Sequence, residues 1–244
     1  MMGKVVLIIQ ARMGSTRLPG KSLMDLCGKP LVGHILERVE RAKTIDQIVL
    51  ATSTTAENDA LADYVTRLGI DVFRGAENDL LERYYKAAIH YNADTVLRLP
   101  ADNPFPEPSE YDRLVEYHQS SDNDFSSNIT NFMGNGYPDG IGVEAITMAA
   151  LKKACENNTQ PDQREHVALN FYDYVNDRVP EGSDFTVGTV KCPENISRPD
   201  IVLDINTQED YQFLRSIYTD IYPENPDFTI HDVIEWFDKR EDVS

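Results

Sequence analysis

Apolar, strand-like runs alternate with amphipathic stretches through the first hundred residues, and this alternation constrains the fold more than any other feature. The apolar runs cover residues 5–11, 47–52, 71–75 and 95–100. The stretches with apolar side chains at helical spacing cover residues 30–43, 58–69 and 80–91. Strands joined through helices predict a parallel sheet with helices on both faces. Because ligands of such sheets bind beyond the carboxyl ends of the strands, we expect the site in the loops that follow these runs.

The second half of the chain is less regular. Strand-like runs cover residues 124–130, 142–148, 185–191 and 200–205. Helical stretches cover residues 148–156, 163–175, a segment from 208 onward and 229–239. No internal repeat, low-complexity segment or interdomain linker separates the two halves. We therefore predict one α/β domain over residues 1–244, built on a mostly parallel mixed sheet of Rossmann-like type.

The first predicted strand leads into the loop GSTRLPGKS, which nearly spells a phosphate-binding P-loop. A P-loop needs glycine at the position that Ser15 occupies here. The two glycines still free the backbone, and the hydroxyl and amide groups between them can donate to phosphate oxygens. The groups that could bind phosphate are those of Arg12, Gly14, Ser15, Thr16 and Lys21. A solvated basic turn is the simpler interpretation, but the loop's position after a strand favours a triphosphate site.

Charge is unevenly distributed along the chain. The formal net charge is −18, yet residues 1–50 hold eight Lys or Arg against four Asp or Glu, a local balance of +4 that leaves −22 elsewhere. Nucleic-acid-binding proteins present basic faces, so this acidity excludes a nucleic-acid partner. Much of the acidic surface serves solubility alone. A cationic segment in an acidic protein suits a small anionic ligand.

Compartment and membrane association follow from what the sequence lacks. No run approaches the roughly 20 apolar residues of a spanning helix, so we expect no membrane partner. The first residues have neither the long apolar core nor the cleavage site of a signal peptide. The three cysteines (Cys27, Cys155 and Cys192) are scattered and odd in number, which indicates a reducing cytoplasm without disulfides or a cysteine-based metal site.

Carboxylates follow two of the predicted strands. Asp102 stands two residues beyond the run 95–100, where it could hold Mg²⁺ together with substrate phosphates. Asp204 lies in the run 200–205, and Asn206 directly follows it. The two are two residues apart, so their side chains would point to the same face of a strand. The alternatives are a simple turn at Asp102 and a helix cap at Asn206 or at Thr207.

Ordered motifs over about residues 5–215 resemble the cytidylyltransferases that make CMP-activated acidic sugars. The opening IIQARMGSTRLPGKSLMDLCGKPLVGHILERV is most similar to the branch called spore coat polysaccharide biosynthesis protein F, and related to CMP-Kdo and CMP-sialic acid synthetases. Further similar stretches are ATSTTAENDAL, VFRGAENDLLERYYKAA, VLRLPADNPFP, GYPDGIGVEAITMAALKKA, REHV and NTQEDY. The resemblance implies a nucleotide-diphospho-sugar transferase type of fold.

The resemblance also implies a reaction and its residues. CMP would pass from CTP to a sugar acid or similar small anion in surface polysaccharide or glycoconjugate synthesis, with release of pyrophosphate and with Mg²⁺ as cofactor. Arg12, Lys21 and Asp102 would be catalytic. The nucleotide would contact Ala11, Arg12, Gly14, Ser15, Thr16, Lys21, Thr52, Ser53, Arg74, Asn78 and Asp102. The metal would contact Asp102, Asp204 and Asn206. Acceptor contacts would come from Glu144, Arg164, Glu165 and His166.

Two departures from the family pattern bear on these roles. Relatives commonly carry Asp where this chain has Asn206, so Asp204 is expected to supply the second metal contact or the site to hold metal more weakly. Relatives often read GLDVE where this chain reads GIGVE, so Gly142 removes a carboxylate from the expected acceptor region. We infer an acceptor unlike the family's best-known ones, or one held by other residues such as those of REHV.

The resemblance further implies how the chain is organised and leaves alternatives open. About 1–120 would bind nucleotide, 121–200 would bind the acceptor and form a homodimer, and 201–244 would add a closing strand and helices. A transferase of another nucleotide, a phosphorylated polyol acceptor and a non-catalytic nucleotide-binding homologue remain alternatives. A glycosyltransferase would be expected to carry Asp-x-Asp, which Ala101-Asp102-Asn103 does not match.

Overall fold

A computed structural model describes residues 3–130 and 132–241, and its centre is a seven-stranded sheet in the order β5-β4-β1-β6-β8-β7-β9. The strands are β1 (Val5–Gln10), β4 (Gln47–Ser53), β5 (Asp71–Gly75), β6 (Thr95–Pro100), β7 (Phe125–Ser127), β8 (Glu144–Thr147) and β9 (Val187–Gly188). Only β8 runs against its neighbours β6 and β7, while the other pairings in this sheet are parallel. A small antiparallel pair, β2 (Asp25–Leu26) and β3 (Lys29–Pro30), lies outside this sheet. The predicted mostly parallel mixed sheet is confirmed.

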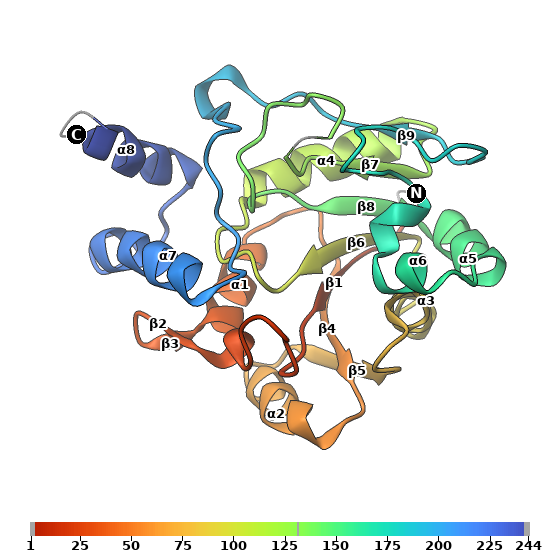
Figure 1. Ribbon diagram of the computed structural model, residues 1–244, viewed down its shortest axis with the longest axis horizontal. Coiled ribbons are helices and arrows are strands. Elements are labelled where there is room, and N and C mark those ends of the chain that lie inside the picture. The colour runs from red at the N-terminus through yellow and green to blue at the C-terminus, as the bar shows by residue number, and fades with distance from the viewer. Residues whose placement is uncertain (1–2, 131, 242–244) are drawn as a thin grey trace.

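Helices cover both faces of the sheet (Figure 1). They are α1 (Leu31–Val39), α2 (Asp59–Arg67), α3 (Leu80–His90), α4 (Pro108–Ser120), α5 (Met148–Asn157), α6 (Pro161–Glu165), α7 (Gln208–Ile221) and α8 (Ile230–Glu241). Short 3-10 turns are η1 (Lys21–Leu23), η2 (Ala56–Asn58), η3 (Val167–Asn170) and η4 (Glu194–Ile196). Helices α1, α7 and α8 lie on one side of the sheet and α3, α5 and α6 on the other. Within the described residues, no helix is both long and apolar enough to cross a membrane.

The central strand shows why both faces need cover. Val5, Leu7 and Ile9 of β1 pack into one apolar core with α1, α4 and α7, whereas Val6 and Ile8 pack into a second core with α3 and α5. All five are at most 2% exposed. Alternate side chains of a strand point to opposite faces, so a continuous apolar run buries both.

Local sequence explains where several helices begin. Asp79 accepts a hydrogen bond from the Glu82 amide at the start of α3, 2.9 Å away. Thr207 and Asp210 form a reciprocal capping box at the start of α7, which confirms the predicted cap at Thr207. These caps satisfy amides that the first turn of a helix leaves free.

Three predictions for the second half are wrong in detail. Residues 163–175 do not form one helix, because the chain leaves helical geometry at His166, between α6 and η3. The Asn170 side chain bonds the carbonyl oxygens of Gln163 and Val167 across this break. Residues 200–205 form no strand of the sheet, and only Val202 makes an isolated bridge, to Asp139. The run 185–191 pairs only over the two residues of β9.

Candidate active site

A cavity of about 440 Å³ opens at the carboxyl ends of β1 and β6. Its lining includes residues at the ends of β1 and β6, the basic loop, the segment before α3 and the end of α6. The predicted site residues that line it are Ala11, Arg12, Ser15, Thr16, Lys21, Asn78, Asp102, Glu165 and His166. Residues far apart in the sequence therefore meet where a parallel sheet is expected to bind its ligand.

The basic loop is closed on itself by one carbonyl. The amides of Ser15 and Gly20 both donate to the Met13 carbonyl oxygen, at 3.0 and 2.9 Å. Gly20 has φ of 76°, a left-handed conformation that favours glycine, and η1 begins at the next residue. This turn brings Lys21 back to the cavity that Ser15 and Thr16 also line.

A buried asparagine fixes the loop to β4. Asn58 accepts from the Met13 amide at 2.8 Å and donates to Ser53 Oγ at 2.7 Å. Ser53 and Thr52 are fully buried and do not line the cavity, so Ser53 supports the loop from behind. Sequence reasoning missed Asn58, because a polar residue between a strand and a helix gives no sign of burial.

Lys21 connects the loop to two other segments. Its Nζ lies 3.2 Å from Asp102 Oδ2 and 2.7 Å from the carbonyl oxygen of Ile205. The Ile205 amide in turn donates to the Asp102 carbonyl at 2.9 Å. The side chain of Lys21 is 15% exposed and that of Asp102 is 27% exposed, so both can still meet a ligand in the cavity. The predicted approach of Asp102 and the segment around Asp204 is present.

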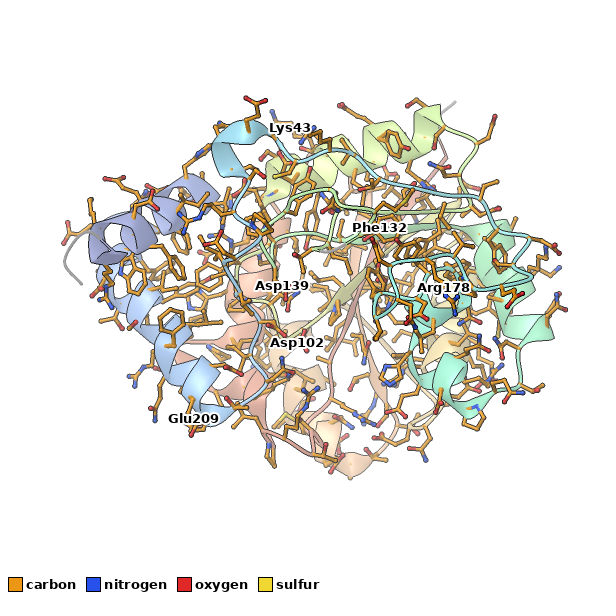
Figure 2. All side chains as sticks on the ribbon, turned by 45° about the horizontal axis from the view of Figure 1, so that its top comes forward. Lys43, Asp102, Phe132, Asp139, Arg178 and Glu209 are labelled. Carbon is orange, nitrogen blue, oxygen red and sulfur yellow. The ribbon has the colours of Figure 1, made fainter. Side chains whose placement is uncertain are left out.

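Two further carboxylates, those of Asp204 and Asp139, lie close enough to Asp102 to interact with its charge. Burial and the charge of Asp102 raise the pKa of Asp204. Burial, then Asp204 and Asp102, raise the pKa of Asp139 to about 6. Figure 2 shows Asp139 next to Asp102, with the amide of Asp139 held by the Ile201 carbonyl at 2.9 Å. The sequence reasoning did not single out Asp139.

The donor set suits the hard cation that the family resemblance implies. Oxygen ligands that repel one another beside a phosphate-binding loop gain from a divalent ion, and Mg²⁺ needs only one or two carboxylates besides substrate phosphates. The described residues contain no group of three or more His, Cys, Asp or Glu that could hold a metal on its own. Asp102 lines the cavity and could hold Mg²⁺ together with a triphosphate, whereas Asp204 lines a separate pocket beside α7. A metal contact of Asp204 remains a prediction.

Asn206 donates hydrogen bonds to two nearby aspartates. Its side-chain amide donates to Asp204 Oδ2, and its backbone amide donates to Asp210 Oδ2 at 3.0 Å. Asn206 thus orients the Asp204 carboxylate at the start of α7. Its direct metal contact remains a prediction.

A second set of predicted residues lines the cavity where the segment before α3 and the end of α6 meet. Arg12 lies 3.4 Å from Glu77 and 4.0 Å from Glu165, so it bridges the segment before α3 and the end of α6. His166 and Asn78 line the cavity beside them. This wall joins the expected nucleotide and acceptor regions.

Two predicted arginines are not among the cavity-lining residues. Arg74 donates to the carbonyls of Ser53 and Thr55 and pairs with Asp59 at 2.6 Å. Arg164 pairs with Asp79 at 2.6 Å and also donates to two carbonyl groups near the end of α5. Both arginines hold wall segments in place, and their direct ligand contacts remain predictions.

Glu144 is buried behind the cavity. Its carboxylate accepts from Arg98 and, at 2.9 Å, from the hydroxyl of Tyr174. The Glu144 side chain is 2% exposed and that of Arg98 is 13% exposed. Arg98 lines the cavity and Glu144 does not, so Glu144 reaches the site by orienting that guanidinium.

Gly142 has a packing role that the sequence comparison with GLDVE did not suggest. A Cβ at this position would lie 2.4 Å from the Asn128 carbonyl oxygen and 2.7 Å from its carbon. Asn128 is itself fixed by accepting from the Val143 amide and by donating to the Glu110 carbonyl. Glycine at 142 therefore has a packing reason in this chain, and its effect on the acceptor remains a prediction.

Replacing Gly142 with alanine should lower the free energy of unfolding by about 1–3 kcal/mol, because the methyl group overlaps backbone atoms that cannot move freely. Urea denaturation measures the change. Gly14→Ala is the matched control, because a Cβ there meets only the flexible end of exposed Glu57. Equal effects of the two substitutions would contradict the packing argument.

Comparison with known proteins decides the family. A family model described as cytidylyltransferase matches residues 6–232. The chain belongs to the cytidylyltransferase family. This membership confirms the resemblance drawn from QARMGSTRLPGKS and the motifs that follow it.

Two relatives and one structural neighbour illustrate the comparisons. The spore coat polysaccharide biosynthesis protein SpsF of Bacillus subtilis is 31% identical over 248 residues, covering 100% of this chain and 98% of its own. A cytidylyltransferase from Leptospira borgpetersenii has a TM-score of 0.85 at 30% identity, covering 99% and 96% of the two chains. A CMP:2-keto-3-deoxy-manno-octonic acid synthetase, solved with CTP, has a TM-score of 0.64 at 18% identity, covering 89% and 99%. The last shows a shared fold.

Proposed function

We propose that this cytidylyltransferase uses Mg²⁺ to transfer CMP from CTP to a sugar acid or similar small anion, in surface polysaccharide or glycoconjugate synthesis. The observation that carries the proposal is the bridge from Lys21 to Asp102 and the Ile205 carbonyl. It brings one cation and one carboxylate together in the lining of a cavity that the basic loop also lines. We also propose that the protein acts as a homodimer in the cytoplasm.

The proposed chemistry is an in-line displacement. The acceptor oxygen forms a bond to the α-phosphorus of CTP, the bond from that phosphorus to the bridging oxygen breaks, and pyrophosphate leaves as the hydroxyl proton passes to solvent. Arg12, Lys21 and the loop amides hold the triphosphate and balance its charge. Mg²⁺, held by Asp102 and Asp204, would supply further neutralisation of the phosphate oxygens.

Two features support catalysis over a non-catalytic nucleotide-binding role. That alternative was motivated by Asn206 and by Gly142. Asp204 and Asp139 supply carboxylates close to Asp102. The Asn128 backbone leaves no room for a Cβ at position 142, which gives the glycine a packing reason.

The test is to incubate the protein with CTP, Mg²⁺ and a mixture of acidic sugars and phosphorylated polyols, and to search for a CMP conjugate by mass spectrometry. We expect a conjugate and an equal amount of pyrophosphate, both absent when EDTA removes the metal. A preference for UTP in the same assay would indicate another nucleotidyltransferase. CTP binding without any conjugate would indicate a non-catalytic homologue.

A further inference from the structure

A buried guanidinium without a charge partner lines the cavity. Arg83, on α3, is 2% exposed and belongs to the cavity lining. Its Nε and Nη1 atoms have no hydrogen-bond partner among the described residues. Nη2 makes one long contact, 3.5 Å to the Glu77 carbonyl oxygen. Buried donors and buried charges are costly when they are left unpaired, so such a group in a native fold calls for a partner.

The nearby carboxylates are already engaged by other groups. Glu77 contacts Arg12 at 3.4 Å and the Thr55 hydroxyl at 3.4 Å. Asp79 pairs with Arg164 and caps the first turn of α3. Both carboxylates act on the Arg83 charge at longer range. Within residues 3–130 and 132–241, Arg83 makes no ion pair, and its Nε and Nη1 have no hydrogen-bond partner.

The other arginines and the lysine in the cavity differ from Arg83. Arg12, Lys21 and Arg98 each contact a carboxylate, from Glu77, Asp102 and Glu144 respectively. Arg17 is exposed to water, which can satisfy its donors. Arg83 is buried and lacks such a contact.

The stem of Arg83 is fixed in this position. A Cβ on Gly75 would lie 3.1 Å from Arg83 Cγ, so the end of β5 packs closely on the aliphatic part of the side chain. Tyr84, the next residue of α3, is fully buried against β1, where its hydroxyl donates to the Ile8 carbonyl. The packing of the aliphatic stem and the burial of the next residue therefore fix where the Arg83 side chain enters the cavity lining.

We propose that Arg83 binds an oxyanion of a substrate inside this cavity, through the N–H groups that the protein leaves free. A planar guanidinium matches carboxylate and phosphate oxygens, and the incoming charge would balance the buried cation. The inference rests on the proposed function, which offers two sources of this chemistry. One is the triphosphate of CTP, and the other is the carboxylate of the acceptor. Arg98, whose Nε is also without a partner, would provide a further donor on the strand side.

Arg83→Gln and Arg83→Lys test this role, with Arg67→Gln on the exposed surface of α2 as the control. Calorimetric titration with CTP and with inorganic pyrophosphate forms the first arm. Pyrophosphate release, with the acceptor found in the transfer assay, forms the second arm and gives separate KM values for CTP and acceptor. Urea denaturation checks that every variant folds.

A loss of about tenfold or more in CTP and pyrophosphate affinity in Arg83→Gln would assign the triphosphate as the oxyanion. An unchanged CTP affinity with a tenfold rise in the acceptor KM would assign the carboxylate. Either result supports the proposal. In each case we expect the affinity or KM of Arg83→Lys to be intermediate and that of Arg67→Gln to match the unaltered protein. CTP affinity and acceptor KM both unchanged in Arg83→Gln would overturn it, as would failure of the unaltered protein to bind CTP or pyrophosphate.

The two hypotheses fail in different ways. An unaltered protein that binds CTP but forms no conjugate contradicts the proposed function, and the CTP titration then decides on Arg83 alone. A protein that forms conjugate equally well with and without Arg83 contradicts only the role of Arg83.

Discussion

Replacing Lys21 with methionine should lower kcat/KM for CTP by about 10²- to 10³-fold in the transfer reaction, the range found when one preorganised donor to a developing charge is removed. Lys21 is the cation that contacts Asp102 and the Ile205 carbonyl at the cavity. Without it, Asp102 would face the triphosphate without the lysine charge that contacts it. Pyrophosphate release at varied CTP concentration measures the change.

The control for Lys21→Met is Lys29→Met. Lys29 is also half-buried and paired, with Glu37 and Tyr222, but it does not line the cavity. We expect Lys29→Met to keep its kcat/KM within about threefold of the unaltered protein. Comparable kinetics in the two variants would contradict the assignment of Lys21 to the triphosphate.

Replacing Glu144 with glutamine should lower the free energy of unfolding by about 3–5 kcal/mol, because it leaves the Arg98 guanidinium buried without a counter-charge. The double variant Glu144→Leu with Arg98→Met should recover most of this loss, since it removes both charges at once. Urea denaturation of the two variants and of the unaltered protein measures the effect.

A surface ion pair provides the comparison for Glu144. Lys152 and Glu156 are 3.9 Å apart on α5, and both side chains are more than half exposed. Glu156→Gln should change stability by less than about 0.5 kcal/mol, because water screens the pair. If Glu144→Gln were equally mild, Arg98 would have to find another partner on losing the carboxylate.

The regular half of the fold was predictable because its signals are local. Residues 5–9 are apolar at every position, which marks a strand buried on both faces. The irregular half was not, because tertiary contacts override local pattern there. Residues 163–175 have apolar side chains at helical spacing, yet the helix ends before His166. The Asn170 side chain donates hydrogen bonds to the carbonyl oxygens of Gln163 and Val167.

The site was predictable where a residue follows a strand or lies in a motif. Lys21 and Asp102 were each placed in the site from the sequence, and in the structure they lie 3.2 Å apart. Arg83 escaped detection because ERYYKAA has the composition of an ordinary helix surface, and nothing in it shows which side chain turns toward a cavity. Asp139 escaped because its partners, Asp102 and Asp204, come from distant segments.

The bridge at Lys21 has a consequence for how the protein is made. Lys21 and the Ile205 carbonyl are 184 positions apart, so a chain still emerging from the ribosome has the basic loop without its partner. Contacts of such wide separation form late in folding. CTP would therefore stabilise the completed fold by mass action and give no help to half-made chains. Newly synthesised molecules would gain protection by nucleotide only after the last quarter of the sequence has docked.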